Sequence, residues 1–158
     1  MIMVKKNKSP VSTRRLSRLN AVQILYQHEQ TETEVGQIIA QYRNYATEID
    51  TNLASFLQPD EPFLQEIVVG VLEHREVIDE EITAYLSSEW RFDRLSLVMR
   101  NILRLAVYEL KFQPLVPTAV ILNEYIEISR DFFGESETAF ANGILDTIAQ
   151  KQRGKTTT

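Results

Sequence analysis

Six positively charged side chains stand at the start of the chain before any acidic residue occurs. They are Lys5, Lys6, Lys8, Arg14, Arg15 and Arg18, and the first acidic residue is Glu29. The rest of the chain holds all 22 acidic residues, and the whole chain has a net charge of −5. A basic arm on an acidic body is a common form of contact with nucleic acid, because Lys and Arg neutralise phosphates. A solvated tail without a partner is the alternative interpretation.

The spacing of the arginines favours the first interpretation. Arg14, Arg15 and Arg18 lie at the start of a predicted helix, where Arg14 and Arg18 share one face. Like charges four residues apart repel each other by about 0.2–0.5 kcal/mol. An anionic partner would remove that cost, so the pattern is typical of a site for phosphate groups.

Enzyme chemistry has little support in the residue types. The chain has two histidines, His28 and His74, and no cysteine. Neither histidine belongs to a metal-binding motif, and the acidic surroundings of His74 favour a helix-surface position. No nucleophile elbow, phosphate-binding loop or dinucleotide-binding loop occurs. We therefore expect no catalytic residue, no metal and no cofactor.

The elements that must position these side chains are all predicted to be helices. Apolar residues recur at helical spacing, and strand-like alternation is absent. The predicted helices cover about residues 13–26, 35–57, 62–86, 97–112, 117–133 and 136–150, with Ser96 as a cap and Pro117 and Gly134 as boundaries. The fold class is therefore all-α, a compact bundle of about six to seven helices with short links.

The length of 158 residues suits a single domain with a real core. We expect a flexible basic arm over residues 1–11, one helical domain over residues 12–150 and a disordered tail over residues 151–158. No apolar run approaches the roughly 18 residues that span a bilayer, and no signal peptide is evident. The cytoplasm is the expected compartment.

Two glycines lie inside predicted helices, where glycine costs up to about 1 kcal/mol relative to alanine. Gly70 indicates a close crossing of two helices. Gly143 follows Asn142 early in the last helix, where an Asn-Gly pair would normally mark a turn. Its backbone is expected to approach either a neighbouring helix, which is the more common reason, or a phosphate.

Four segments together resemble the NusB family of bacterial transcription antitermination factors, over about residues 13–148. They are Arg14-Arg15-Leu16-Ser17-Arg18 leading to Leu25-Tyr26, Ile102 to Leu110, Pro117 to Ser129 with Asn123-Glu124, and Phe140 to Asp146. Each is weak alone, but the four in this order and spacing are specific. The resemblance implies two packed three-helix subdomains and no catalysis.

The resemblance also implies partners. Proteins of this family bind the single-stranded boxA element of ribosomal RNA transcripts together with NusE, a small-subunit ribosomal protein. The complex joins the RNA polymerase antitermination assembly and promotes read-through of terminators. A monomer and a homodimer both fit the sequence.

The site residues follow from the matched motifs. For RNA they are Arg14, Arg15, Arg18, Arg104, Thr138, Phe140, Asn142 and Gly143, with Lys5, Lys6 and Lys8 as an extension. Phe140 would either stack on a base or fill the core. For the protein partner they are Tyr26, Tyr85, Met99 and Arg100.

The chain departs from the family pattern at several of these positions. Leu16 and Ala139 take places that are often basic, Met99 takes one that is often acidic, and the segment 134–140 is one residue short. These changes keep open a second interpretation, a helical interaction module without RNA affinity. The same fold resembles the N-terminal domain of certain ribosomal RNA methyltransferases, but the chain has no cysteine nucleophile and no following cofactor domain.

Overall fold

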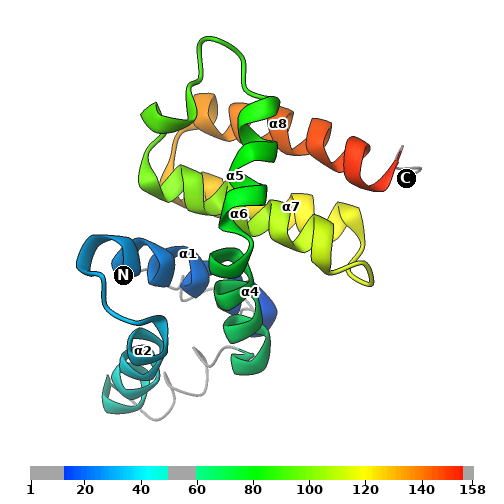
Figure 1. Cartoon of the computed structure of the whole chain (residues 1–158). Helices are drawn as coiled ribbons and strands as arrows, with labels where there is room; N and C mark the ends of the chain where they lie inside the picture. Colours follow the sequence, from blue (N-terminus) through cyan, green and yellow to red (C-terminus); the bar gives the residue numbers. More distant parts are fainter. Residues whose placement is uncertain (1–12, 50–59, 155–158) are drawn as a thin grey trace. The chain divides into compact units, whose positions relative to one another are not determined.

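The structure is a computed structural model that describes residues 13–49 and 60–154, without the side chains of 45–49. Within these ranges the regular elements are helices and no strand occurs, so the predicted all-α fold is confirmed (Figure 1). The helices are α1 (Thr13–Thr31), α2 (Val35–Ile49), α4 (Glu61–Glu73), α5 (Arg75–Ala84), α6 (Leu97–Phe112), α7 (Thr118–Phe132) and α8 (Glu135–Arg153), with a short 3₁₀ helix, η1 (Phe92–Arg94).

The chain divides into two compact units, the first ending at Val69 and the second beginning at Gly70. The border lies inside α4, so the predicted domain 12–150 consists of two units. No helix in the described ranges combines the length and the apolar character that crossing a membrane requires.

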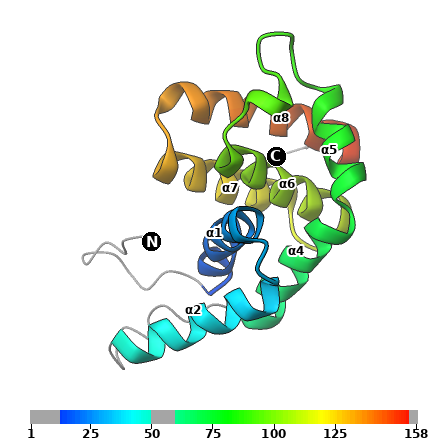
Figure 2. The same cartoon turned by 60° about the vertical axis from the view of Figure 1, so that its left-hand side comes forward.

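In the first unit α1 packs against α2, and a short segment connects the two helices (Figure 2). Glu32 ends α1 in the left-handed region, at φ 57°, and its N–H donates to the carbonyl of His28 at 2.8 Å. This is the usual way in which a left-handed residue closes the last turn of a helix. Among the residues of this unit that the structure describes, the buried apolar ones are Leu16, Leu19, Ala21, Val22, Ile24, Leu25, Ile38, Ile39, Phe63, Leu64, Ile67 and Val68.

Asp60 ties the start of α4 to α1. Its Oδ1 accepts from the N–H of Phe63 at 3.1 Å, which satisfies one of the unpaired amides at the helix start. The hydroxyl of Ser17 donates to the Asp60 carbonyl at 3.0 Å and accepts from the Asp60 N–H at 2.8 Å. These bonds fix Asp60 beside the first turns of α1.

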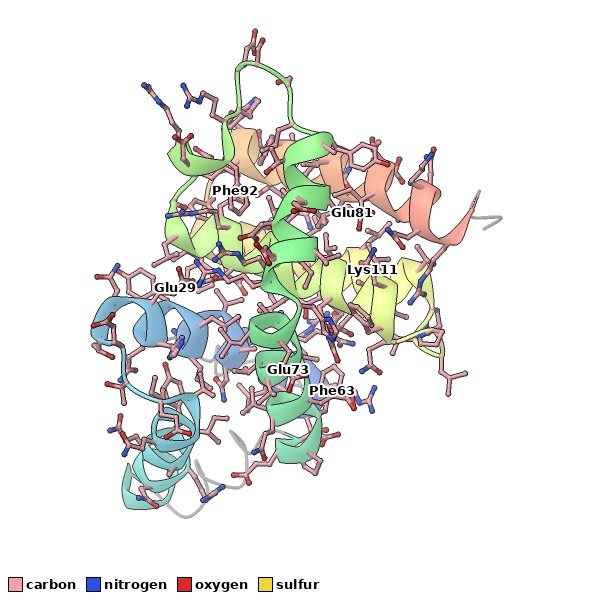
Figure 3. The ribbon with its side chains drawn as sticks, viewed as in Figure 1. Glu29, Phe63, Glu73, Glu81, Phe92 and Lys111 are labelled. Carbon is pink, nitrogen blue, oxygen red and sulfur yellow. The ribbon has the colours of Figure 1, made fainter. Side chains whose placement is uncertain are left out.

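The centre of the second unit is α6, in which every residue from 101 to 110 is buried. It packs against α5, α7 and α8, and α7 packs against α8. Ser96 caps α6 as predicted, because its side chain accepts from the N–H of Met99 at 3.1 Å. Lys111 near the end of α6 pairs with Glu81 of α5 at 2.9 Å (Figure 3).

Gly70 confirms the predicted close crossing of two helices. A Cβ atom added at Gly70 would lie 2.2 Å from Cε1 of the Tyr108 ring. That distance is far inside van der Waals contact, so the ring of α6 occupies the space that a side chain on α4 would need.

The C-terminal end of α6 is held by Arg153, in the last turn of α8. Its guanidinium donates to the carbonyls of Glu109 at 3.1 Å, Leu110 at 3.0 Å and Gln113 at 2.7 Å, and also to that of Val116. Burial lowers the pKa of Arg153, while the charge of Glu109 opposes that shift. Because of these bonds α8 continues to Arg153, past the predicted end at residue 150, and residues 151–153 do not belong to a disordered tail.

The predicted helix over residues 62–86 is in fact two helices, α4 and α5. At His74 the backbone leaves the helical region, with φ −111° and ψ 18°. The imidazole stacks on the ring of Phe112, with the ring centroids 4.2 Å apart. His74 is therefore a packed ring at a helix junction. The predicted helix 35–57 is described as far as Ile49, where α2 ends, and the rest of that prediction lies outside the described residues.

Candidate nucleic-acid interface

Two of the three predicted arginines at the start of α1 are exposed, and the third is buried. Arg14 and Arg15 lie on the first turn and are open to solvent, whereas Arg18 is only 2% exposed. Lys5, Lys6 and Lys8 lie outside the described residues. Of the six basic residues at the start of the chain, Arg14 and Arg15 are therefore the ones that the structure describes as exposed.

Phe63 and Asp60 explain how Arg14 and Arg18 share one helix face. The guanidinium of Arg14 lies 4.3 Å from the centroid of the Phe63 ring, and that of Arg18 lies 5.1 Å from it. Cations at this distance from a ring are attracted by about 0.5–2 kcal/mol, according to their exposure. Arg14 also lies 3.6 Å from Oδ2 of Asp60. Phe63 and Asp60 thus offset part of the repulsion between Arg14 and Arg18, which from the sequence we expected an anionic partner to relieve.

The second unit contains the other predicted RNA residues, on α8. Phe140 stacks on Trp90, with the ring centroids 4.3 Å apart and the planes inclined by 22°. Both side chains are half-buried. Phe140 is thus neither a fully buried core residue nor an isolated exposed ring, and sequence reasoning did not name its neighbour Trp90.

Asn142 and Gly143 are exposed on α8. Within the described part of the chain, no atom outside the local helix backbone lies within 4 Å of the place where a Cβ of Gly143 would stand. Helix packing, the more common reason for such a glycine, therefore does not explain it. Thr138 is buried, and its hydroxyl proton is donated to the carbonyl of Gly134 at 2.9 Å.

An open groove of about 640 Å³ lies between α7 and α8. Its lining residues are Ala119, Leu122, Asn123, Ile126 and Arg130 of α7 and Glu135, Thr138, Ala139 and Asn142 of α8. The two exposed asparagines bring amide groups, which can both donate and accept hydrogen bonds, to the same groove. Arg130 forms an ion pair with Glu127 on its own helix.

Arg104, which the matched motif assigned to RNA binding, does not lie on the surface. It is 2% exposed, and it donates to both carboxylate oxygens of Asp79 on α5. It also donates to Oδ1 of Asn101 at 3.0 Å, and its guanidinium lies 5.3 Å from the Phe92 ring. A side chain held in this way joins two helices, so we leave Arg104 out of the candidate interface.

The residues predicted to face a protein partner are placed unequally. Tyr26 is 42% exposed, and Tyr85 is half-buried at the end of α5. Met99 is buried, and Arg100 is half-buried with its guanidinium 5.8 Å from the Phe92 ring. Tyr26 is thus the most accessible of the four.

Taken together, the fold and the site define an all-helical protein with exposed arginines at one helix start and stacked, half-exposed rings beside another. These are the groups with which proteins hold phosphates and unpaired bases.

Comparison with known proteins gives the family. A family model described as the NusB family matches residues 15–150. The transcription antitermination protein NusB of Sphingopyxis alaskensis is 40% identical over 143 residues, which are 90% of this chain and 96% of that protein. The NusB of Caulobacter vibrioides is 36% identical, again over 90% of this chain and 96% of that protein. The chain belongs to the NusB family.

Solved structures agree on the fold. NusB of T. maritima matches with a TM-score of 0.71 at 34% identity, over 89% of this chain and 92% of that one. A chain from a crystal structure of antitermination factors NusB and NusE in complex with double-stranded RNA matches with a TM-score of 0.69 at 23% identity, over 87% of this chain and 96% of that one.

Proposed function

We propose that this chain is a transcription antitermination factor that binds boxA-type single-stranded RNA together with NusE. The observation that carries the proposal is the 40% identity, over nine-tenths of the chain, to a protein that bears this function in its name. In this proposal the protein is non-catalytic, acts in the cytoplasm and joins the RNA polymerase antitermination complex.

The geometry supports an RNA-binding role in each unit separately. In the first unit Arg14 and Arg15 are exposed on the first turn of α1, where their charges can reach phosphates. In the second unit Asn142 and Gly143 are exposed, and the open space at Gly143 admits a close approach to the backbone. Tyr26, exposed on α1, is proposed to face NusE, since tyrosine is a frequent anchor of protein interfaces.

One observation favours the alternative, a helical interaction module without RNA affinity. Arg14 pairs with Asp60, and Arg18 is buried over Phe63, so both of these predicted phosphate ligands already have contacts within the chain. Only a binding measurement separates the two functions.

The test is a titration of labelled boxA-type RNA against a scrambled RNA of equal length, with and without NusE, at several salt concentrations. We expect preference for the boxA-type RNA, tighter binding with NusE, and a log K that falls linearly with log salt. For single-stranded RNA the slope is about −0.7 for each phosphate neutralised. Equal affinity for both RNAs, unchanged by NusE, would contradict antitermination and favour the interaction module.

The oligomeric state affects how much of this surface is available. Sedimentation of the free protein, and of its mixture with the RNA, separates a monomer from a homodimer. A homodimer that RNA dissociates would place the arginine surface inside the subunit interface.

A further inference from the structure

The segment between α5 and α6 brings the chain's single tryptophan to α8. It leaves the helices of the second unit as a projecting loop before η1 (Figures 1 and 2). Trp90 in this loop stacks on Phe140, which comes 50 residues later. Phe140 lies one turn before the buried Ile144, at the edge of the buried face of α8, and neither Phe140 nor Trp90 is fully buried.

We propose that Trp90 and Phe140 form a stacking platform for one unpaired base of the RNA. This inference rests on the proposed function and adds to it one residue, Trp90, as the second ring of the stack expected of Phe140. Two nearly parallel rings make a rigid aromatic surface, and both side chains are only half-buried, so part of that surface is open to solvent. Every base has a flat π-face, and such platforms hold single strands largely without regard to sequence.

The charges around the platform indicate that stacking, and not phosphate neutralisation, is its main contribution. Arg91 and Arg94 are exposed beside Trp90, but Glu89 and Asp93 are exposed in the same segment. Arg91 lies 3.3 Å from Asp93, and both side chains are about two-thirds exposed, so this ion pair is weak. The positive and negative charges of this segment largely balance, so the platform differs from the start of α1, where exposed arginines provide a positive charge.

The single tryptophan allows a direct test on the unmodified protein. A base that stacks on Trp90 quenches its fluorescence, and no other tryptophan of this chain contributes to the signal. We expect a saturable quench when boxA-type RNA is added to the full chain with NusE, after correction for the emission of NusE. The quench should follow the same binding curve as the anisotropy of the labelled RNA.

Two substitutions of similar apolar character separate stacking from packing. Trp90→Leu keeps an apolar side chain without a π-face, and Trp90→Phe keeps a ring. We expect Trp90→Leu to weaken RNA binding by roughly 5- to 140-fold and Trp90→Phe to retain most of the affinity. Neither should change the salt slope, since stacking releases no counterions. Circular dichroism and thermal unfolding would confirm that both variants fold.

The outcomes are distinguishable. RNA binding without a quench, with equal affinity of both variants, overturns the platform and leaves the proposed function intact. A quench caused by NusE alone, without RNA, also overturns it and assigns Trp90 to a protein contact. No specific RNA binding by the unmodified protein overturns both the platform and the proposed function.

Discussion

Arg104 donates hydrogen bonds to both carboxylate oxygens of Asp79, from Nε to Oδ1 at 2.8 Å and from Nη2 to Oδ2 at 3.0 Å. The pair joins α6 to α5. Arg104 is 2% exposed, while the side chain of Asp79 is 24% exposed and also lies 3.7 Å from Nε of Arg75. Without Asp79, Arg104 would therefore be a buried charge that has lost this carboxylate, whereas Asp79 without Arg104 would keep partial contact with solvent and with Arg75.

This asymmetry predicts unequal effects on the free energy of unfolding. Asp79→Ala leaves a buried guanidinium without its carboxylate, which typically costs 3–5 kcal/mol, and we expect about 3 because Asn101 still accepts from Arg104. Arg104→Met leaves a partly exposed carboxylate beside Arg75, so the loss should be smaller. Urea unfolding of the two variants measures the difference. A larger loss for Arg104→Met than for Asp79→Ala would contradict the inferred asymmetry between the two partners.

The two helical glycines predict stability effects of opposite sign. Gly70→Ala forces a Cβ into the ring of Tyr108, and overpacking of this kind typically costs about 1–3 kcal/mol. Gly143→Ala meets open space on a helix and should stabilise the protein by up to about 1 kcal/mol. Thermal unfolding compares the two. If RNA approaches the backbone at Gly143, Gly143→Ala should also weaken RNA binding although the protein is more stable.

The exposed arginines predict a change in the salt dependence of RNA binding. Arg15→Ala should weaken binding and reduce the steepness of log K against log salt by about 0.7, the value for one phosphate contact on a single strand. Lys151→Ala is the matched control, since it removes one exposed positive charge from the last turns of α8. Equal slopes for Arg15→Ala and the unmodified protein would remove Arg15 from the interface.

Asp60 predicts a variant that binds RNA more tightly. Asp60→Asn keeps an oxygen that can cap α4 at Phe63 but removes the negative charge near Arg14. If Arg14 contacts a phosphate, affinity should rise by about 1.4- to 5-fold, which corresponds to the usual 0.2–1 kcal/mol of an exposed ion pair. The same titration with Asp60→Asn plus Arg14→Ala should show no gain. A gain in that double variant would mean that Asp60 repels the RNA directly.

Glu61 predicts a local pH dependence. Its hydrogen bond with Arg43, Nε to Oε1 at 2.5 Å, lowers the pKa of the Glu61 carboxyl below its ordinary value. A group with a lowered folded pKa stabilises the folded state above its unfolded pKa, and that contribution is lost as the pH falls through the folded pKa. Arg43→Ala should raise the pKa of Glu61 toward the ordinary value in an NMR titration. Arg91→Ala, which breaks another exposed ion pair, should leave it unchanged.

The helices themselves could be predicted from the sequence, because apolar periodicity and caps act locally. Ser96 caps α6 as expected, and Gly70 marks a real crossing. The break at His74 could not be predicted, since no proline or glycine stands there and the ring that His74 contacts, Phe112, is distant in sequence.

The candidate site was less predictable for the same physical reason. Arginines were expected on the surface, yet Arg18 and Arg104 are buried, because each has found a distant partner that a linear pattern does not show. The stacking of Trp90 on Phe140 likewise depends on the tertiary fold. A tryptophan between charged residues in a connecting segment was the signal that could have indicated it.

The contacts of Arg153 also set an order of events during synthesis. Carbonyls at the end of α6 and in the segment after it receive their guanidinium partner only from the last turn of α8. On the ribosome, α6 emerges well before residue 153, and until then these carbonyls lack the guanidinium, although those of Glu109 and Gln113 can already accept from the N–H groups of Gln113 and Val116. The second unit therefore completes its hydrogen bonding after α8 has left the exit tunnel, and not helix by helix.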